Sequence, residues 1–172
     1  TNINLNGRGS DKETRHIELL LDNFGEEYEP GDCVVVLPQN DPAIVDLLIS
    51  TLGWSPETQV LINEDGDTLN LEEALTSHFE ITKLPPREYS ISSSYKATPD
   101  EVHITVGAVR YQAHGRERSG VCSVQFAERI QEGDTIPIYL KRNPNFKFPQ
   151  DESTPVIMIG PGTGVAPFRS YM

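Results

Sequence analysis

The chain has 172 residues, the size of one ordinary domain or of one domain with a fragment of a second. Its net charge of −12 disfavours nucleic acid, because an acidic surface repels phosphate backbones, but is compatible with a basic protein partner. No apolar run approaches the roughly 18 residues of a membrane span, and no signal-peptide pattern is present. Cys33 and Cys122 have neither disulfide-framework nor CxxC spacing and indicate a reducing, cytoplasmic compartment.

Strands are predicted along most of the chain, several of them entered through tight turns. Apolar or alternating runs place expected strands at residues 15–22, 33–37, 58–65, 87–94, 101–110, 132–140 and 153–160. The last of these, "STPVIMIG", is apolar throughout, which is typical of a strand buried on both faces of a parallel sheet. Pro30-Gly31-Asp32 and Gly133-Asp134 are the turns expected to lead into two of the strands.

Helices are expected in a few places between the strands. They are predicted at residues 41–53, 70–79 and 120–130. Asp41 can cap the first helix, Pro42 suits its first position and Gly53 suits the position just after its end. Asn70 and Glu73 have the spacing of a capping box at the start of the second.

The pattern changes near residue 153, which suggests two domains. Residues 1–153 carry strands, tight turns and few helices, and therefore predict a mainly β domain built as an antiparallel barrel. From residue 154 a strand, a glycine loop and a helix follow one another, which is how a doubly wound α/β domain begins. We therefore expect a barrel at 1–153 and the truncated start of a nucleotide-binding domain at 154–172.

The glycine loop "GPGTGVAPFR" has the form of a phosphate site. Glycines after a strand let backbone N–H groups approach an anion, and the following helix start adds partial positive charge. Here Gly160, Gly162 and Gly164 are followed by Val165, so the usual G-x-G-x-x-G dinucleotide pattern is not met. Three glycines alone also fit a plain turn, whereas the run as a whole is more specific.

The stretch "REYS" combines three kinds of chemistry. Arg87 is a fixed cation with a planar fork that suits a pyrophosphate. Tyr89 lies on the same face of a strand and offers an aromatic plane for stacking on a ring. Ser90 points to the opposite face unless the strand bends. An exposed strand with a surface arginine is the plainer interpretation of these residues alone.

A second anion site is suggested at the start of the helix at 120–130. Gly120 lets the backbone approach closely, the first N–H groups point outward, and Ser123 adds a hydroxyl. An ordinary helix start capped by Ser119 fits the same residues.

Taken together, these stretches resemble a known family. "REYSISSS", "HITVGAVRY", "GVCSVQF", "NPNFKFP" and "TPVIMIGPGTGVAPFR" occur in the order found in the ferredoxin–NADP reductase-like FAD domain of the diflavin reductases, in particular the flavoproteins of NADPH-dependent sulfite reductases. "RHIE", "YEPGD", "QNDP" and "HFEIT" extend the resemblance to the first half. The resemblance implies a Greek-key antiparallel β-barrel that binds FAD.

The resemblance also implies roles for individual residues. Arg87 would bind the FAD pyrophosphate, Tyr89 would stack on the flavin, and the Ser90 hydroxyl would hydrogen-bond near flavin N5 as the catalytic residue. The remaining implied FAD contacts are Thr82, Thr105, Val106, Gly107, Tyr111, Gly120, Val121, Cys122 and Ser123. The incomplete NADP loop would comprise Gly160, Gly162, Thr163 and Gly164.

For the parent protein the resemblance implies electron transfer from NADPH through FAD to FMN. The partners would be an FMN-binding domain and the haem-containing sulfite reductase subunit. Two alternatives remain open: a minimal FAD-binding module without NADPH turnover, and the FAD domain of another diflavin reductase, such as a cytochrome P450 reductase-like protein.

The sequence departs from the family at two places. Relatives have a helical connecting subdomain between the segments matching "HFEIT" and "PREYS", whereas here only the junction at 82–86 separates them. Family members continue past the position of Met172 with the rest of the NADPH domain, so efficient NADPH oxidation is not expected of this chain.

Other sequence features indicate no further chemistry. The four histidines have no H-x-x-H or H-E-x-x-H spacing, so no metal site is expected. No Gly-x-Ser-x-Gly motif indicates a hydrolase. The acidic run at 24–32 fits a solvated loop or a docking surface for a basic partner. Arg142 and Lys147 lie in a locally basic run that fits a solvated loop or a phosphate contact.

Overall fold

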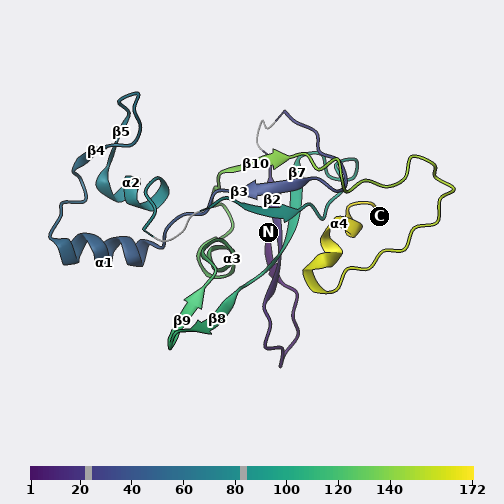
Figure 1. The fold of residues 1–172 in the computed structure, drawn as a ribbon, viewed down its shortest axis with the longest axis horizontal. Helices are drawn as coiled ribbons and strands as arrows, with labels where there is room; N and C mark the ends of the chain where they lie inside the picture. The colour runs from purple at the N-terminus through teal and green to yellow at the C-terminus, as the bar shows by residue number, and fades with distance from the viewer. Residues whose placement is uncertain (22–24, 82–84) are drawn as a thin grey trace.

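Two antiparallel three-stranded sheets form the body of the protein (Figure 1). The computed structural model describes residues 1–21, 25–81 and 85–172. The first sheet has the strand order β1-β2-β7 and the second has the order β10-β3-β6. These strands are β1 (Asn2–Asn4), β2 (Thr14–Leu20), β7 (Glu101–Gly107), β10 (Ile138–Lys141), β3 (Cys33–Val36) and β6 (Arg87–Ser90). The mainly β, antiparallel fold expected from the sequence is confirmed.

One apolar core joins the two sheets. Ile17 of the first sheet and Val34 of the second are fully buried in it, together with Phe126. An isolated antiparallel bridge between Ile91 and Ile104 links the end of β6 to β7, so the sheets meet along one edge. Across the ranges that the structure describes, the strands do not close into the expected barrel.

A small lobe lies to the left of the sheets in Figure 1 and has its own core. It contains α1 (Pro42–Leu52), the hairpin of β4 (Gln59–Leu61) and β5 (Thr68–Asn70), and α2 (Leu71–Ser77). Its buried residues are Val45, Ile49, Leu71 and Leu75. The apolar faces of the two helices therefore pack on each other and not on the sheets.

The starts of both helices in this lobe and the end of α1 are those predicted from the sequence, whereas α2 ends at Ser77, two residues before the predicted end. The Asp41 carboxylate accepts a hydrogen bond from the Ala43 N–H at 3.0 Å, and Gly53 ends α1 with φ 64°. The Asn70 side chain accepts from the Glu73 N–H at 2.8 Å and caps α2. Such caps satisfy N–H groups that have no partner inside the helix.

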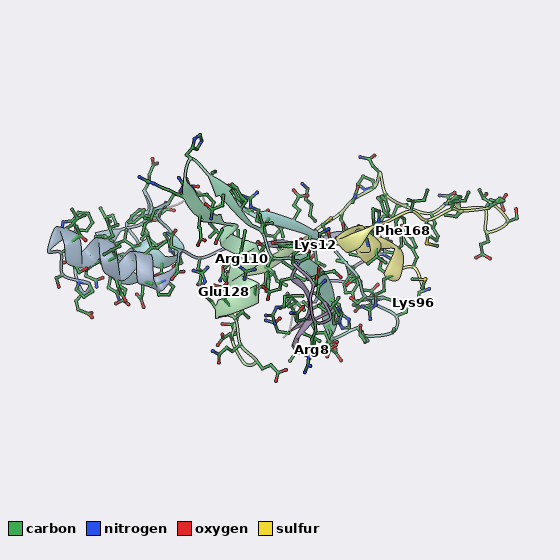
Figure 2. The ribbon with its side chains drawn as sticks, turned by 90° about the horizontal axis from the view of Figure 1, so that it is seen from below. Arg8, Lys12, Lys96, Arg110, Glu128 and Phe168 are labelled. Atoms are coloured by element: carbon green, nitrogen blue, oxygen red, sulfur yellow. The ribbon has the colours of Figure 1, made fainter. Side chains whose placement is uncertain are left out.

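A hairpin and a short helix connect the two sheets. The strands β8 (Arg110–Ala113) and β9 (Arg116–Ser119) are joined by His114 and Gly115, both with positive φ. Arg110 forms ion pairs with Glu13 at 2.8 Å and Glu128 at 2.6 Å, which fasten the base of this hairpin (Figure 2). The helix α3 (Val121–Val124) continues as the π-helical turn η1 (Gln125–Arg129).

The expected strand at 153–160 is absent, and this prediction is wrong. Residues 155–160 belong to no helix or strand, and Ile157 and Ile159 are 86% and 79% exposed. A strand is stable only when its N–H and C=O groups pair with a neighbour, and the described part of the chain supplies no strand beside this segment. It forms part of the long yellow-green excursion in Figure 1.

The chain then returns to the body through two short helices. These are η2 (Gly162–Val165) and α4 (Ala166–Arg169). Tyr171 stacks on Phe148 with ring centroids 3.6 Å apart and donates a hydrogen bond to the Phe146 carbonyl at 2.9 Å. Among the residues described, no helix has the length and apolarity needed to cross a membrane.

Candidate functional site

The strand β6 presents two of the predicted site residues on one face. Arg87 lies opposite Val36 of β3, and Tyr89 lies opposite Val34. The Tyr89 ring is partly buried against the core and meets the Phe126 ring edge to face, with centroids 6.1 Å apart at 87°. The ring is therefore held by packing on the core.

Tyr89 also contacts the start of α3. Its hydroxyl and the Cys122 thiol lie close enough that each shifts the pKa of the other. Burial raises the pKa of Tyr89 above its usual range, and Cys122 adds to the effect. Burial also raises the pKa of the Cys122 thiol, although Tyr89 and Arg87 partly oppose it. Both groups are therefore neutral at pH 7, and Cys122 lacks the lowered pKa of a reactive cysteine.

Arg87 supplies a free positive charge beside this contact. Its side chain is exposed, and it forms no ion pair with any residue that the structure describes. Its charge lowers the pKa of both Tyr89 and Cys122, which places the guanidinium close to both. An uncommitted guanidinium next to an aromatic ring can receive an anionic group of an aromatic ligand.

The beginning of α3 adds further donors. Within the described chain, the N–H groups of Val121, Cys122 and Ser123 have no hydrogen-bond acceptor, as expected for the first turn of a helix. Gly120 precedes them with φ −69°, so its left-handed freedom is not used. A Cβ at this position would lie 2.6 Å from the Ser123 Oγ, so glycine is needed for close approach.

The Ser123 hydroxyl has an internal role. It accepts a hydrogen bond from the Val109 N–H at 3.1 Å and donates to the Gly120 carbonyl at 3.4 Å. The Gly120 N–H donates to the Val109 carbonyl at 2.8 Å. Ser123 and Val109 therefore hold the first turn of α3 against the connection that follows β7.

Ser90 lies apart from Tyr89. It pairs with Cys33 in the β6–β3 register, and its side chain lies close enough to lower the pKa of the Cys33 thiol. Tyr89 instead packs on the core, so the strand is regular here and the two side chains point to opposite faces. The structure does not bring Ser90 together with Arg87 and Tyr89.

The predicted residues of β7 are also divided between two faces. Val106 is fully buried in the core, whereas Thr105 lies on the other face, opposite His16 of β2. Gly107 ends the strand, and a Cβ there would lie 3.5 Å from the Thr163 methyl group. Tyr111 on β8 is 56% exposed. Thr82 lies outside the residues that the structure describes.

The glycine loop folds tightly without the strand expected before it. A Cβ on Gly160 would lie 2.3 Å from the Gly164 carbonyl oxygen, and Gly162 has φ +60°. Gly164 donates its N–H to the Pro161 carbonyl at 3.1 Å. Two of the three glycines are thus required by close approach or by backbone conformation.

Two residues that sequence reasoning missed complete the site. The Phe126 ring packs against the Tyr89 ring. In the sequence Phe126 lies on the apolar face of the predicted helix, which indicated only that it is a core residue. Val109 anchors α3 through its backbone alone, so no sequence signal for it exists.

Comparison with known proteins shows the class to which this fold and site belong. A family model described as "FAD binding domain" matches residues 1–82 and 75–124. The chain belongs to this family of FAD-binding domains.

Individual relatives narrow the comparison. The chain is 46% identical over 233 residues to the "Sulfite reductase [NADPH] flavoprotein alpha-component" of Bacillus subtilis (strain 168), which covers 99% of this chain. Proteins with the same name from Photorhabdus laumondii and Escherichia coli (strain K12) are 38% and 35% identical, over 98% and 99% of the chain. The chain spans 38% of the length of these relatives. The aligned 233 positions exceed its 172 residues, so the relative from Bacillus subtilis has residues there without a counterpart in this chain.

Proposed function

We propose that this chain is the FAD-binding part of an NADPH-dependent sulfite reductase flavoprotein. The observation that carries the proposal is the grouping of the exposed Arg87 guanidinium, the Tyr89 ring and the N–H groups at the start of α3, which have no acceptor among the described residues. These groups match two parts of FAD, its anionic pyrophosphate and its aromatic flavin ring. The relatives that align with nearly the whole chain carry the same flavoprotein name.

The residues fit the cofactor as follows. Arg87 and the N–H groups of residues 121–123 bind the pyrophosphate, since charge-assisted hydrogen bonds are strong where water is displaced. Gly120 lets Ser123 and Val109 pack closely against the start of α3, which holds these N–H groups in place. The Tyr89 ring, fixed by Phe126, orients the flavin ring. When bound, FAD accepts a hydride and releases its electrons singly.

The other implied contacts remain part of the proposal. Thr105, Val106 and Gly107 would line the cofactor through the backbone of β7, since Val106 points its side chain into the core. Tyr111 is exposed and free to pack against the adenosine part. Thr82 is proposed on resemblance alone. The Ser90 role near flavin N5 would require β6 to bend at its end, because Ser90 now faces Cys33.

We propose the same place in electron transfer for this chain as for its relatives. In the whole protein electrons would pass from NADPH to FAD, then to an FMN-binding domain and to a haem-containing sulfite reductase subunit, in the cytoplasm. The printed name of the relatives supports NADPH and sulfite reduction. The acidic net charge of the chain is compatible with a basic partner surface.

The proposed domain boundaries rest on two observations. The family model matches in two pieces that overlap at residues 75–82, which supports a connecting segment of the relatives placed at 82–86. The family match ends at residue 124, and residues 154–172 would begin the NADPH-binding domain, with Gly160, Gly162, Thr163 and Gly164 as its first phosphate loop.

One observation favours a second candidate, an FAD-binding module without NADPH turnover. The segment before the glycine loop is unpaired and exposes Ile157 and Ile159, so the loop is not mounted on a sheet. The test is to load the chain with FAD and add NADPH without oxygen, with dithionite as the control reductant. Bleaching by dithionite alone supports the module, whereas rapid bleaching by NADPH supports turnover in this chain.

A further inference from the structure

The outer face of the β1-β2-β7 sheet carries a cluster of side chains that the FAD site does not use. His16 and Glu18 are two residues apart on β2 and therefore share a face, and His103 on β7 lies directly opposite Glu18. The rings of His16 and His103 meet edge to face, with centroids 5.2 Å apart. Strands β2 and β7 run side by side in Figure 1, with α4 near them.

We propose that His16, Glu18 and His103 form a binding site for one divalent transition-metal ion of the zinc class. Each residue offers one ligand atom, and the three atoms lie within 4.8 Å of one another. The His16 Nε2 and a Glu18 carboxylate oxygen are 3.1 Å apart. Two ligands bonded to zinc at about 2.0–2.1 Å in tetrahedral geometry lie about 3.3 Å apart, so this pair is already close to the required spacing.

The His103 ring provides an independent observation. It is 7% exposed, and its Nδ1 is buried without a hydrogen-bond partner among the described residues. Its Nε2 lies 3.0 Å from a Glu101 carboxylate oxygen. Because a carboxylate only accepts, the neutral form of the ring has its proton on Nε2 and a lone pair on Nδ1. A buried imidazole oriented by a carboxylate on its other nitrogen is the usual arrangement of a metal-binding histidine.

The charges around the cluster are compatible with a cation. Glu18 and Glu101 supply two carboxylates, and the facing cations are Arg169 and the amino group of Thr1. Burial lowers the pKa of His16, and the Arg169 charge lowers it further against the opposing effect of Glu18.

The donor set limits the kind of ion. Two imidazoles and one carboxylate suit zinc, copper or nickel, whereas calcium and magnesium prefer oxygen ligands alone. Three protein ligands leave a fourth tetrahedral position for water. The spacing of the histidines along the sequence could not reveal this site, because its ligands come from two strands far apart in the sequence.

The test is calorimetric titration of the purified chain with Zn²⁺, supported by the visible spectrum of bound Co²⁺. We expect one ion per chain, and binding at least about tenfold weaker in Glu18→Gln and in His16→Gln, since even partners outside the ligand set are worth about 10–100-fold. His78→Gln, at the exposed end of α2, is the matched control and should bind like the wild type.

Both test residues are partly exposed, so the variants should fold, and their melting temperatures without metal verify this. Zinc should raise the melting temperature of the wild type and of His78→Gln, but not of the other two. Absence of saturable binding by the wild type, or equal binding by Glu18→Gln and His16→Gln, would overturn the proposal.

Discussion

The hydroxyl of Tyr89 on β6 meets the thiol of Cys122 at the start of α3. This contact brings together two stretches that the sequence separates, the strand with Arg87 and the helix start with the free N–H groups. Neither group ionises at neutral pH, so the contact positions the ring and the helix without adding charge.

Replacing Tyr89 separates the role of its ring from that of its hydroxyl. Tyr89→Phe keeps the aromatic plane and should retain FAD binding. Tyr89→Ala should weaken binding by up to about tenfold, because an aromatic pair is worth about 0.5–1.5 kcal/mol. Fluorescence titration with FAD measures both variants. Tyr139→Ala, on the neighbouring strand β10 with 47% exposure, is the control. Unchanged binding by Tyr89→Ala would remove Tyr89 from the site.

Arg87→Ala should weaken FAD binding by about 2–3 kcal/mol, or roughly 30–150-fold, through loss of a charge-assisted pyrophosphate contact. Isothermal titration with FAD gives the dissociation constants. Arg8→Ala removes another exposed charge, from the N-terminal hairpin (Figure 2), and should have little effect. If the two variants bind FAD with the same affinity as the wild type, the pyrophosphate does not lie at Arg87.

Gly120→Ala should destabilise the fold by about 1–3 kcal/mol, the usual range for an overpacked site. The added Cβ would lie 2.6 Å from the Ser123 Oγ and 3.2 Å from the Val109 side chain, so the first turn of α3 must move. Urea unfolding measures the change. Gly7→Ala places its Cβ in open space and serves as the matched control. Equal stability of the two variants would mean that the first turn of α3 is not packed as described.

Asp32 makes the stability of the fold depend on pH in the acidic range. Its carboxylate is fully buried and pairs with Arg142 and Lys147, each at 2.9 Å. Burial alone would raise the pKa of Asp32, but hydrogen bonds from Lys147, from two backbone N–H groups and from Arg142 outweigh it and lower the pKa to about 2. Arg142 and Lys147, for which the sequence left a solvated loop and a phosphate contact open, bind this carboxylate in the structure.

The sign of the pH effect follows from the lowered pKa. The stabilisation is complete above the pKa of about 3.9 expected for the unfolded chain and is lost as pH falls through about 2. Asp32→Asn should therefore lower stability at pH 7 by about 2 kcal/mol and flatten the acid dependence. Urea unfolding measured from pH 7 down to about pH 2 tests both the loss of stability and the flatter acid dependence. Asp151→Asn, at an exposed position, is the control. An unchanged acid dependence in Asp32→Asn would contradict this role.

Local rules predicted the parts of the fold that depend on neighbouring residues. The caps by Asp41 and Asn70 and the end at Gly53 are correct because each involves atoms within a few residues. The strands β2 and β3 were predicted because their apolar residues enter the core. Residues 153–160 have an equally apolar pattern, yet form no strand, because pairing requires a neighbour that the sequence pattern does not reveal.

The site shows the same division. Arg87, Tyr89 and the helix start at Gly120 were predicted, and the structure brings them together. The Ser123 hydroxyl could not be assigned in advance, because its partner Val109 acts through its backbone. Ser90 and Tyr89 point to opposite faces of β6, as neighbours in a regular strand do. The role near flavin N5 that the resemblance implies for Ser90 depends on a bend that this structure does not have.

The most direct test of the FAD site is the visible spectrum of the chain after mixing with FAD and gel filtration. We expect one bound FAD per chain, with its fluorescence quenched next to Tyr89, and a clear loss of bound flavin in Arg87→Ala. A chain that is folded by circular dichroism and elutes without flavin would contradict it.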